Sequence, residues 1–161
     1  MADVFISFIH EEEKVATSLQ QLLRAQFDKS KIFLSADEWQ IHAGEQWLEK
    51  IRAELEAAKI VALMLSPRSV SRPWVNFEAG GAWLTGKVIV PVCFCGLKKG
   101  SLPKPYSNFQ AVEIPEDTYY LIRSISHHLG EAIPPPPLMY DMKEFEQLKQ
   151  SIKEVDCGGA A

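Results

Sequence analysis

Short, almost continuous apolar runs alternate along the chain with stretches in which apolar residues recur every three to four positions. The first pattern is typical of strands covered on both faces of a parallel sheet, and the second of amphipathic helices. It predicts strands over residues 4–8, 31–34, 60–65, 88–94 and 111–114, and helices over residues 11–27, 45–58, 73–84 and 116–129. We therefore expect an α/β, flavodoxin-like domain with a five-stranded parallel sheet in the order 2-1-3-4-5 and helices on both faces.

Four consecutive prolines at residues 134–137 interrupt this alternation, and we expect them to be extended because proline cannot continue a helix. A further amphipathic helix is predicted over residues 141–155, and its partner is the domain itself, another copy or a second domain. The expected division is a domain over residues 1–132 and, over 133–161, a proline-rich linker, this helix and a disordered tail from residue 157. A connection to a sensor domain through this segment is one expectation.

The charge balance argues against several classes of partner. The 161 residues are 47% hydrophobic, with 17 Lys and Arg against 21 Asp and Glu, a net charge of -4. An acidic chain with no basic patch is not expected to bind nucleic acid or a membrane surface. The N-terminus lacks the features of a secretory signal, no run reaches the length of a membrane span, and the three cysteines lack metal-ligand spacing. We expect a cytoplasmic protein with reduced thiols and no metal site.

The predicted strand order also predicts where a ligand binds, since open α/β sheets bind ligands outside the carboxyl ends of their strands, at the point where the order reverses. This rule selects Phe8, Ile9 and His10 after the first strand, and the segment from Ser66 to the helix at residue 73. The sequence contains no Walker loop, no G-x-G-x-x-G after a strand, no acidic end to the third strand and no G-x-S-x-G elbow.

Glu78 is the candidate functional carboxylate at this edge. It is the one charged residue between Arg72 and Lys87, and the positions one helical turn away hold no cation. Burial of a carboxylate in such surroundings is costly, so its presence favours a functional role. Trp74 lies one turn earlier on nearly the same face. Gly80 and Gly81 indicate either the close approach of a ligand or backbone, or tight helix packing.

Two other segments bear on the site. The connection over residues 35–44 is longer than most βα loops and carries Trp39 and Ile41, which are candidates for covering a ligand or docking on another subunit. His42 in this loop is expected to be solvated. The three acids at residues 11–13 follow His10 and could suggest a metal site, but we expect them to mark a helix N-terminus, where acids are favoured.

Taken together, several motifs resemble those of Toll/interleukin-1 receptor (TIR) domains over about residues 2–130. The first motif is residues 3–8 (DVFISF), and the second is the loop motif of residues 37–45, closed by Gly44. Further on come residues 60–67, the segment of residues 71–74, the pair Trp74 and Glu78, and residues 88–92.

The resemblance implies a function as well as a fold, since one group of TIR domains cleaves NAD+ between nicotinamide and ribose. By this resemblance Glu78 is the catalytic residue, Phe8, Ile9 and His10 line the nucleotide pocket, and Trp74 and Trp39 contact the substrate. The resemblance also assigns assembly to the loop with Trp39, Gln40, Ile41, His42 and Gly44. NAD+ is then a substrate rather than a cofactor, and activation by self-assembly in immune defence, with a homo-oligomer and a sensor as partners, is the expected setting.

Two alternatives remain open. A non-catalytic TIR scaffold would act only through homotypic contacts, and the position of Glu78 favours the enzyme over it. Nucleoside deoxyribosyl transfer also uses a carboxylate at a ribosyl carbon, and the long loop over residues 35–44 argues against it.

Overall fold

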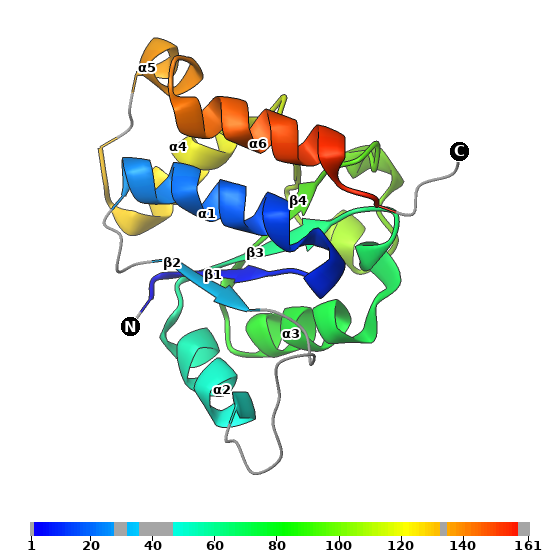
Figure 1. Ribbon diagram of the computed structural model, residues 1–161. Coiled ribbons are helices and arrows are strands. Elements are labelled where there is room, and N and C mark those ends of the chain that lie inside the picture. The colour runs from blue at the N-terminus through cyan, green and yellow to red at the C-terminus, as the bar shows by residue number, and fades with distance from the viewer. Residues whose placement is uncertain (1, 28–31, 36–46, 133–134, 158–161) are drawn as a thin grey trace.

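The protein, seen as a computed structural model, is described over residues 2–27, 32–35, 47–132 and 135–157. Its sheet consists of β1 (Val4–Ser7), β2 (Ile32–Ser35), β3 (Ile60–Leu65), β4 (Val88–Cys93) and β5 (Val112–Glu113). All neighbouring strands are parallel and the order is β2-β1-β3-β4-β5 (Figure 1). The predicted flavodoxin-like topology is confirmed, with strand ends that differ from the predicted ones by at most one residue.

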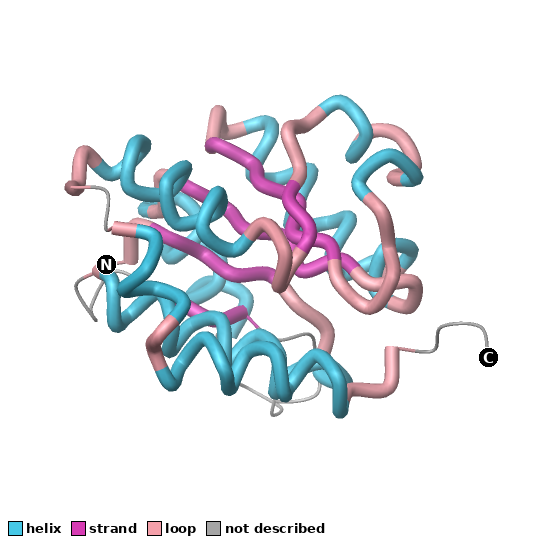
Figure 2. Tube along the Cα trace, turned by 90° about the horizontal axis from the view of Figure 1, so that it is seen from above, coloured by secondary structure: helices cyan, strands magenta, loops and turns pink. Residues whose placement is uncertain are grey.

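Alternate residues of each strand serve two separate core layers, because successive side chains of a strand point to opposite faces. Val4 and Ile6 of β1 pack with α1 (Glu13–Gln26), α4 (Thr118–Leu129) and α6 (Lys143–Glu154). Phe5 packs on the other face with α2 (Trp47–Ala57) and α3 (Pro73–Leu84). The helices therefore cover both faces of the sheet, as Figures 1 and 2 show.

Most predicted helices are found, and α3 has the predicted bounds. The N-terminal part of the helix expected over residues 11–27 is instead a 3₁₀ helix, His10–Glu12, that leads into α1. The expectation that all four prolines are extended is wrong for Pro136 and Pro137, which form the first turn of the short helix α5 (Pro136–Tyr140). Proline is tolerated in a first helical turn because the amide hydrogens there have no partner within the helix.

The C-terminal helix packs on the domain itself. Phe145 and Leu148 of α6 are buried in the core layer that contains α1, and the hydroxyls of Ser18 and Ser151 lie 2.5 Å apart between these two helices. Of the three partners considered for this helix, the structure shows the first. The division at residue 132 and the attachment of a sensor stay predictions.

A disulfide ties the end of the chain to the sheet. Cys95, in the loop after β4, is bonded to Cys157, and their Cα atoms are 6.3 Å apart. Cys157 is buried, so the expectation of reduced thiols and of a disordered tail from this residue on is wrong at this position. The pairing joins residues 62 positions apart, and the sequence pattern alone gives no sign of that proximity. The cytoplasmic location stays a prediction that the cysteines do not support.

Candidate functional site

The carboxyl ends of β1, β2 and β3 bring three serines to one edge of the sheet. Ser7 and Ser35 end neighbouring strands and are register partners, and Ser66 follows β3 directly. Ser7 shares the face of Phe5, and Ser35 that of Phe33, on the side covered by α2 and α3. Ser7, Ser35 and Ser66 are all fully buried. The sheet thus presents hydroxyl groups at the edge where the strand order predicts a ligand.

Glu78 reaches this edge from the middle of α3. Its side chain is only 1% exposed. The Ser7 hydroxyl donates a hydrogen bond to Oε1 of Glu78, and the Ser35 hydroxyl donates one to Oε2 at 2.5 Å. Each carboxylate oxygen therefore has a donor, which offsets part of the cost of burying the group.

The hydrogen-bond partners of Glu78 lie far from it in the sequence, so the pattern of α3 alone does not reveal them. Glu78 is separated from Ser7 by 71 positions and from Ser35 by 43. The helix positions one turn from Glu78 hold no cation. The strands supply neutral donors instead, and a register between β1 and β2 is needed to foresee them.

The other predicted residues around Glu78 occupy different environments. Trp74 is half-buried one turn before it, and its ring stacks on Phe77 with 5.9 Å between centroids. Phe8 and Ile9 are buried in opposite core layers, whereas His10 is exposed, with its ring 4.0 Å from the Glu13 carboxylate. The structure brings Trp74 near Glu78 along one helix, and the substrate contacts of all four residues stay predictions.

Five of the predicted residues lie outside the described part of the chain. These are the members of the predicted assembly loop, namely Trp39, Gln40, Ile41, His42 and Gly44. Their roles in substrate binding and assembly stay predictions.

Sequence reasoning missed a second buried carboxylate, Glu12. The sequence pattern explains it only as an acid at a helix N-terminus, yet it is 0% exposed. Oε2 of Glu12 accepts a hydrogen bond from the Ser66 hydroxyl, while Oε1 is buried and has no partner in the described part of the chain. Glu12 precedes Val15 by three positions and Leu19 by seven, so it extends the buried stripe of α1. That spacing was the available signal.

The surroundings of Glu12 shift its titration. Burial raises the pKa of the Glu12 carboxyl from about 4.5 to about 7, although the nearby hydroxyl groups of Ser66 and Ser69 and the charge of Arg68 act in the opposite direction. Desolvation dominates because the carboxylate is removed from water and one oxygen lacks a donor. A group with such a pKa exists in both protonation states near neutral pH.

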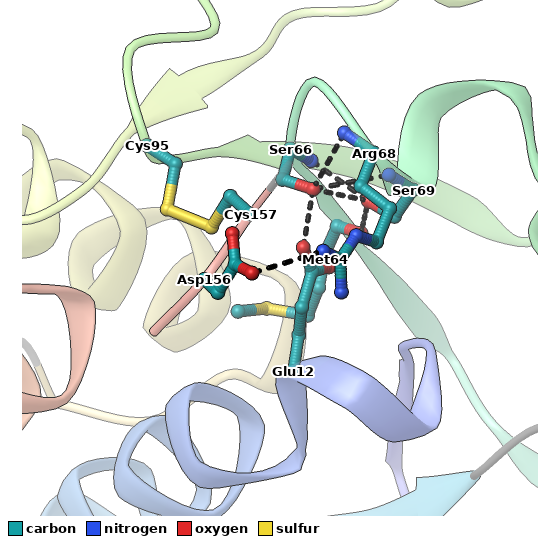
Figure 3. The surroundings of a disulfide bond; sticks show 8 residues. All are labelled: Glu12, Met64, Ser66, Arg68, Ser69, Cys95, Asp156 and Cys157. Carbon is teal, nitrogen blue, oxygen red and sulfur yellow. Dashed lines mark hydrogen bonds and ion pairs between the residues drawn. A yellow bond between two sulfur atoms is a disulfide. The ribbon is translucent and has the colours of Figure 1, made fainter. Parts of the chain in front are cut away.

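The turn after β3 and the end of the chain enclose Glu12 (Figure 3). The Ser66 amide donates to the Ser69 hydroxyl at 2.7 Å, and that hydroxyl donates to the carbonyl of Met64 at 3.0 Å. Arg68 in the same turn lies 3.5 Å from Asp156, next to the disulfide. The C-terminal segment is thereby held by an ion pair and a covalent bond beside this carboxylate.

A separate apolar groove of about 500 Å³ lies along α3. The α3 residues that line it are spaced at one-face helical intervals, at positions 76, 79, 80 and 83, and Glu78 is not among them. The segment of residues 105–109 forms its opposite wall. Trp83 is 64% exposed there. The groove is therefore an apolar surface of α3 distinct from the carboxylate site.

Within residues 2–27, 32–35, 47–132 and 135–157, no three His, Cys, Asp or Glu side chains are grouped as metal ligands. In the same residues, no helix has the length and apolar character needed to span a bilayer.

Comparisons with known proteins agree with this architecture. A family model described as "TIR domain" matches residues 4–120. A metazoan TIR-STING receptor from C. gigas in complex with 2',3'-cGAMP is 24% identical, with a TM-score of 0.56 over 78% of this chain and 40% of the receptor. A second structure of a C. gigas TIR-STING receptor gives 21% identity and a TM-score of 0.53 over the same shares. The comparison with curated proteins finds no match.

The TIR domains of the activated Roq1 resistosome, which directly recognises the pathogen effector XopQ, cover 97% of this chain at 13% identity and a TM-score of 0.46. This chain covers all of that domain. The C. gigas identities indicate a shared fold, and the chain spans about 40% of the length of those receptors.

Proposed function

Because the chain belongs to the TIR domain family, we propose that it cleaves NAD+ at the bond between nicotinamide and ribose. The products are nicotinamide and ADP-ribose, with some cyclic ADP-ribose when an atom of the same nucleotide replaces water as the attacking group. The observation that carries the proposal is the buried carboxylate of Glu78, held one turn after Trp74 at the edge of the sheet where the strand order predicts a ligand.

The chemistry of this bond suits a single carboxylate. Nicotinamide departs with the bonding electron pair from a positively charged ring nitrogen, so it leaves as a neutral molecule and needs no proton. The ribosyl carbon is left with oxocarbenium-like positive charge, which a fixed negative charge stabilises. Water then adds to that carbon and releases a proton. Glu78 supplies the charge, and the serines that hold its oxygens limit its movement.

The burial of Glu78 bears on how the reaction is controlled. At 1% exposure the carboxylate is closed to a nucleotide, so the substrate reaches it only after neighbouring segments move. We propose that self-association of the domain supplies this change, with the predicted loop of residues 37–45 as the assembly element. Such gating suits an immune effector whose output is depletion of NAD+. In the TIR-STING receptors the matched region is part of a longer chain. By analogy, we propose that a sensor domain or protein acts together with this TIR domain.

One observation favours a second function. The two serine hydrogen bonds of Glu78 connect α3 to β1 and β2, and a buried group with these bonds also stabilises the fold. A non-catalytic scaffold that assembles through homotypic contacts would retain such a group for structure alone.

An assay of nicotinamide release separates these functions. The protein is incubated with NAD+ at high concentration or with a crowding agent, because a dilute sample would leave the assembled state unpopulated. We expect the wild type to release nicotinamide and Glu78→Gln to release almost none. Absence of release from the wild type in every assembling condition would contradict the enzymatic function, while equal release from Glu78→Gln would contradict the role of Glu78.

A further inference from the structure

We infer that Ser7 and Ser35 are positioning residues that hold the Glu78 carboxylate ionised and in a fixed orientation for bond cleavage. This inference rests on the proposed function. The two serines act through Glu78 and not through contact with the substrate. Ser7 donates a hydrogen bond to Oε1 of the carboxylate, and Ser35 donates one to Oε2.

The geometry gives the carboxylate two rigid points of attachment. Ser7 and Ser35 are register partners on neighbouring strands, and both are fully buried. The Phe8 amide donates to the Ser35 carbonyl at 3.4 Å, so the pairing of the two strands continues past the serines. Two donors fixed by one sheet set the rotation of the carboxylate plane, whereas a single donor would leave it free to pivot.

Glu12, at the same edge of the sheet, is a buried carboxylate that has a hydrogen-bond donor on only one of its oxygens. Glu12 accepts one serine hydrogen bond, on Oε2 alone, and burial raises its pKa to about 7. Hydrogen bonds to the charged form favour that form. The second serine at Glu78 therefore matters for charge as well as for orientation, because stabilisation of an oxocarbenium-like ribose requires the ionised carboxylate.

The kinetic test uses Ser7→Ala, Ser35→Ala and the double variant. We expect kcat to fall roughly 10- to 100-fold for each, by analogy with the loss of hydrogen-bond partners that orient metal ligands, with KM changed less than about two-fold. The acidic limb of the pH profile of kcat should move to higher pH, because the ionised form loses a donor. In a Glu78→Gln background, the same serine changes should have no further effect on residual release.

Matched variants distinguish positioning from folding. Ser7→Cys and Ser35→Cys keep the size and a weak donor, so they should recover part of kcat. Ser18→Ala removes a buried hydroxyl of similar environment between α1 and α6, and it should leave kcat and the pH profile unchanged. Thermal unfolding of each variant checks that it remains folded.

A second measurement needs no turnover. The carbon signal of the Glu78 carboxyl, assigned by its loss in Glu78→Gln, is titrated by NMR in the wild type and in the serine variants. Its midpoint should rise in Ser7→Ala and Ser35→Ala and stay unchanged in Ser18→Ala. Folded serine variants with an unchanged midpoint and an unchanged kcat would overturn the inference. Absence of nicotinamide release from the wild type would defeat the proposed function instead, and the titration would then decide alone whether the serines hold the carboxylate.

Discussion

Glu78 and Glu12 are two buried glutamates at the same edge of the sheet, and each accepts a hydrogen bond from a serine hydroxyl. They differ in the face they occupy and in how completely they are bonded. Glu78, on the α3 side, has a donor on both oxygens, whereas Glu12, on the α1 side, has one on Oε2 alone among the described residues. Burial therefore does not by itself distinguish a held carboxylate from one that is poised to take up a proton.

The largest expected difference between them lies in catalysis. Glu78→Gln removes the negative charge at the ribosyl carbon and should lower nicotinamide release at least 100-fold. Glu12→Gln is the matched control, because it makes the same change in a buried, serine-bonded glutamate and imitates the protonated form that Glu12 already adopts near neutral pH. It should leave release within about two-fold of the wild type. Equal losses in both variants would remove the functional distinction between the two sites.

The disulfide gives the next largest effect, and it lies beside Glu12 (Figure 3). Cys95 and Cys157 are 62 residues apart, and opening a loop of that length is expected to lower the free energy of unfolding by about 4 kcal/mol in the chain-entropy account. Addition of a dithiol reductant should therefore lower the urea midpoint of the wild type.

A variant supplies the control for that measurement. Cys157→Ala should start from the lower midpoint and show no response to the reductant, since no disulfide remains. Loss of the bond frees the segment around Asp156 and admits water to Glu12, so the pKa of Glu12 should fall toward its ordinary value. Glu78 lies on the other face of the sheet and its titration should not change. An identical response to the reductant in both proteins would contradict the bond.

The raised pKa of Glu12 predicts a dependence of stability on pH. Between about pH 4.5 and pH 7 the folded protein holds a proton on Glu12 that the unfolded chain has lost, so the contribution of this group to stability falls as the pH rises through that window. The full change is about 3 kcal/mol at 1.36 kcal/mol per pH unit. Below pH 4.5 and above pH 7 the contribution is constant.

Comparison with Glu12→Gln isolates this dependence from that of the other carboxylates. The difference in free energy of unfolding between variant and wild type, measured with urea from pH 4 to pH 8, should move in favour of the variant as the pH rises. A difference that is constant over this range would show that Glu12 titrates normally.

The contrast between the two glutamates also shows what a sequence can predict. The sheet and its order follow from apolar runs, since strands such as β3 are buried on both faces and leave a clear signal. Glu78 stands out because its helix is otherwise uncharged. Glu12 was missed because an acid at a helix start has an ordinary electrostatic explanation, although its spacing to Val15 and Leu19 placed it on the buried stripe.

The remaining features depend on proximity in space. The hydrogen bonds of Glu78 with Ser7 and Ser35 require the register of two strands and the placement of α3 over them. The disulfide requires the path of the chain around α6, which no local pattern encodes. Pro136 and Pro137 are helical because a first helical turn tolerates proline, whereas a run of four prolines predicts an extended segment.

The smallest expected effects come from two adjacent glycines of α3. This helix carries Glu78, and none of its described residues is hydrogen-bonded to Glu12. A Cβ at Gly80 would meet nothing within 4 Å, so Gly80→Ala should raise the free energy of unfolding by about 0.5–1 kcal/mol through helix propensity and leave nicotinamide release unchanged.

A Cβ at Gly81 would lie 3.3 Å from Cδ2 of Leu55 on α2, so the glycine at this position allows α3 to pack closely against α2. In Gly81→Ala the new Cβ displaces the end of the half-buried Leu55 side chain by a few tenths of an ångström, so the gain in helix propensity is partly offset and stability should rise less than in Gly80→Ala. The part of the contact that Leu55 does not relieve shifts α3 and moves Glu78 relative to Ser7 and Ser35, so release should be slightly lower than in Gly80→Ala while the titration of Glu12 stays the same. Equal activity of the two alanine variants would mean that the carboxylate tolerates such a shift and that its serine contacts are less exacting than the geometry implies.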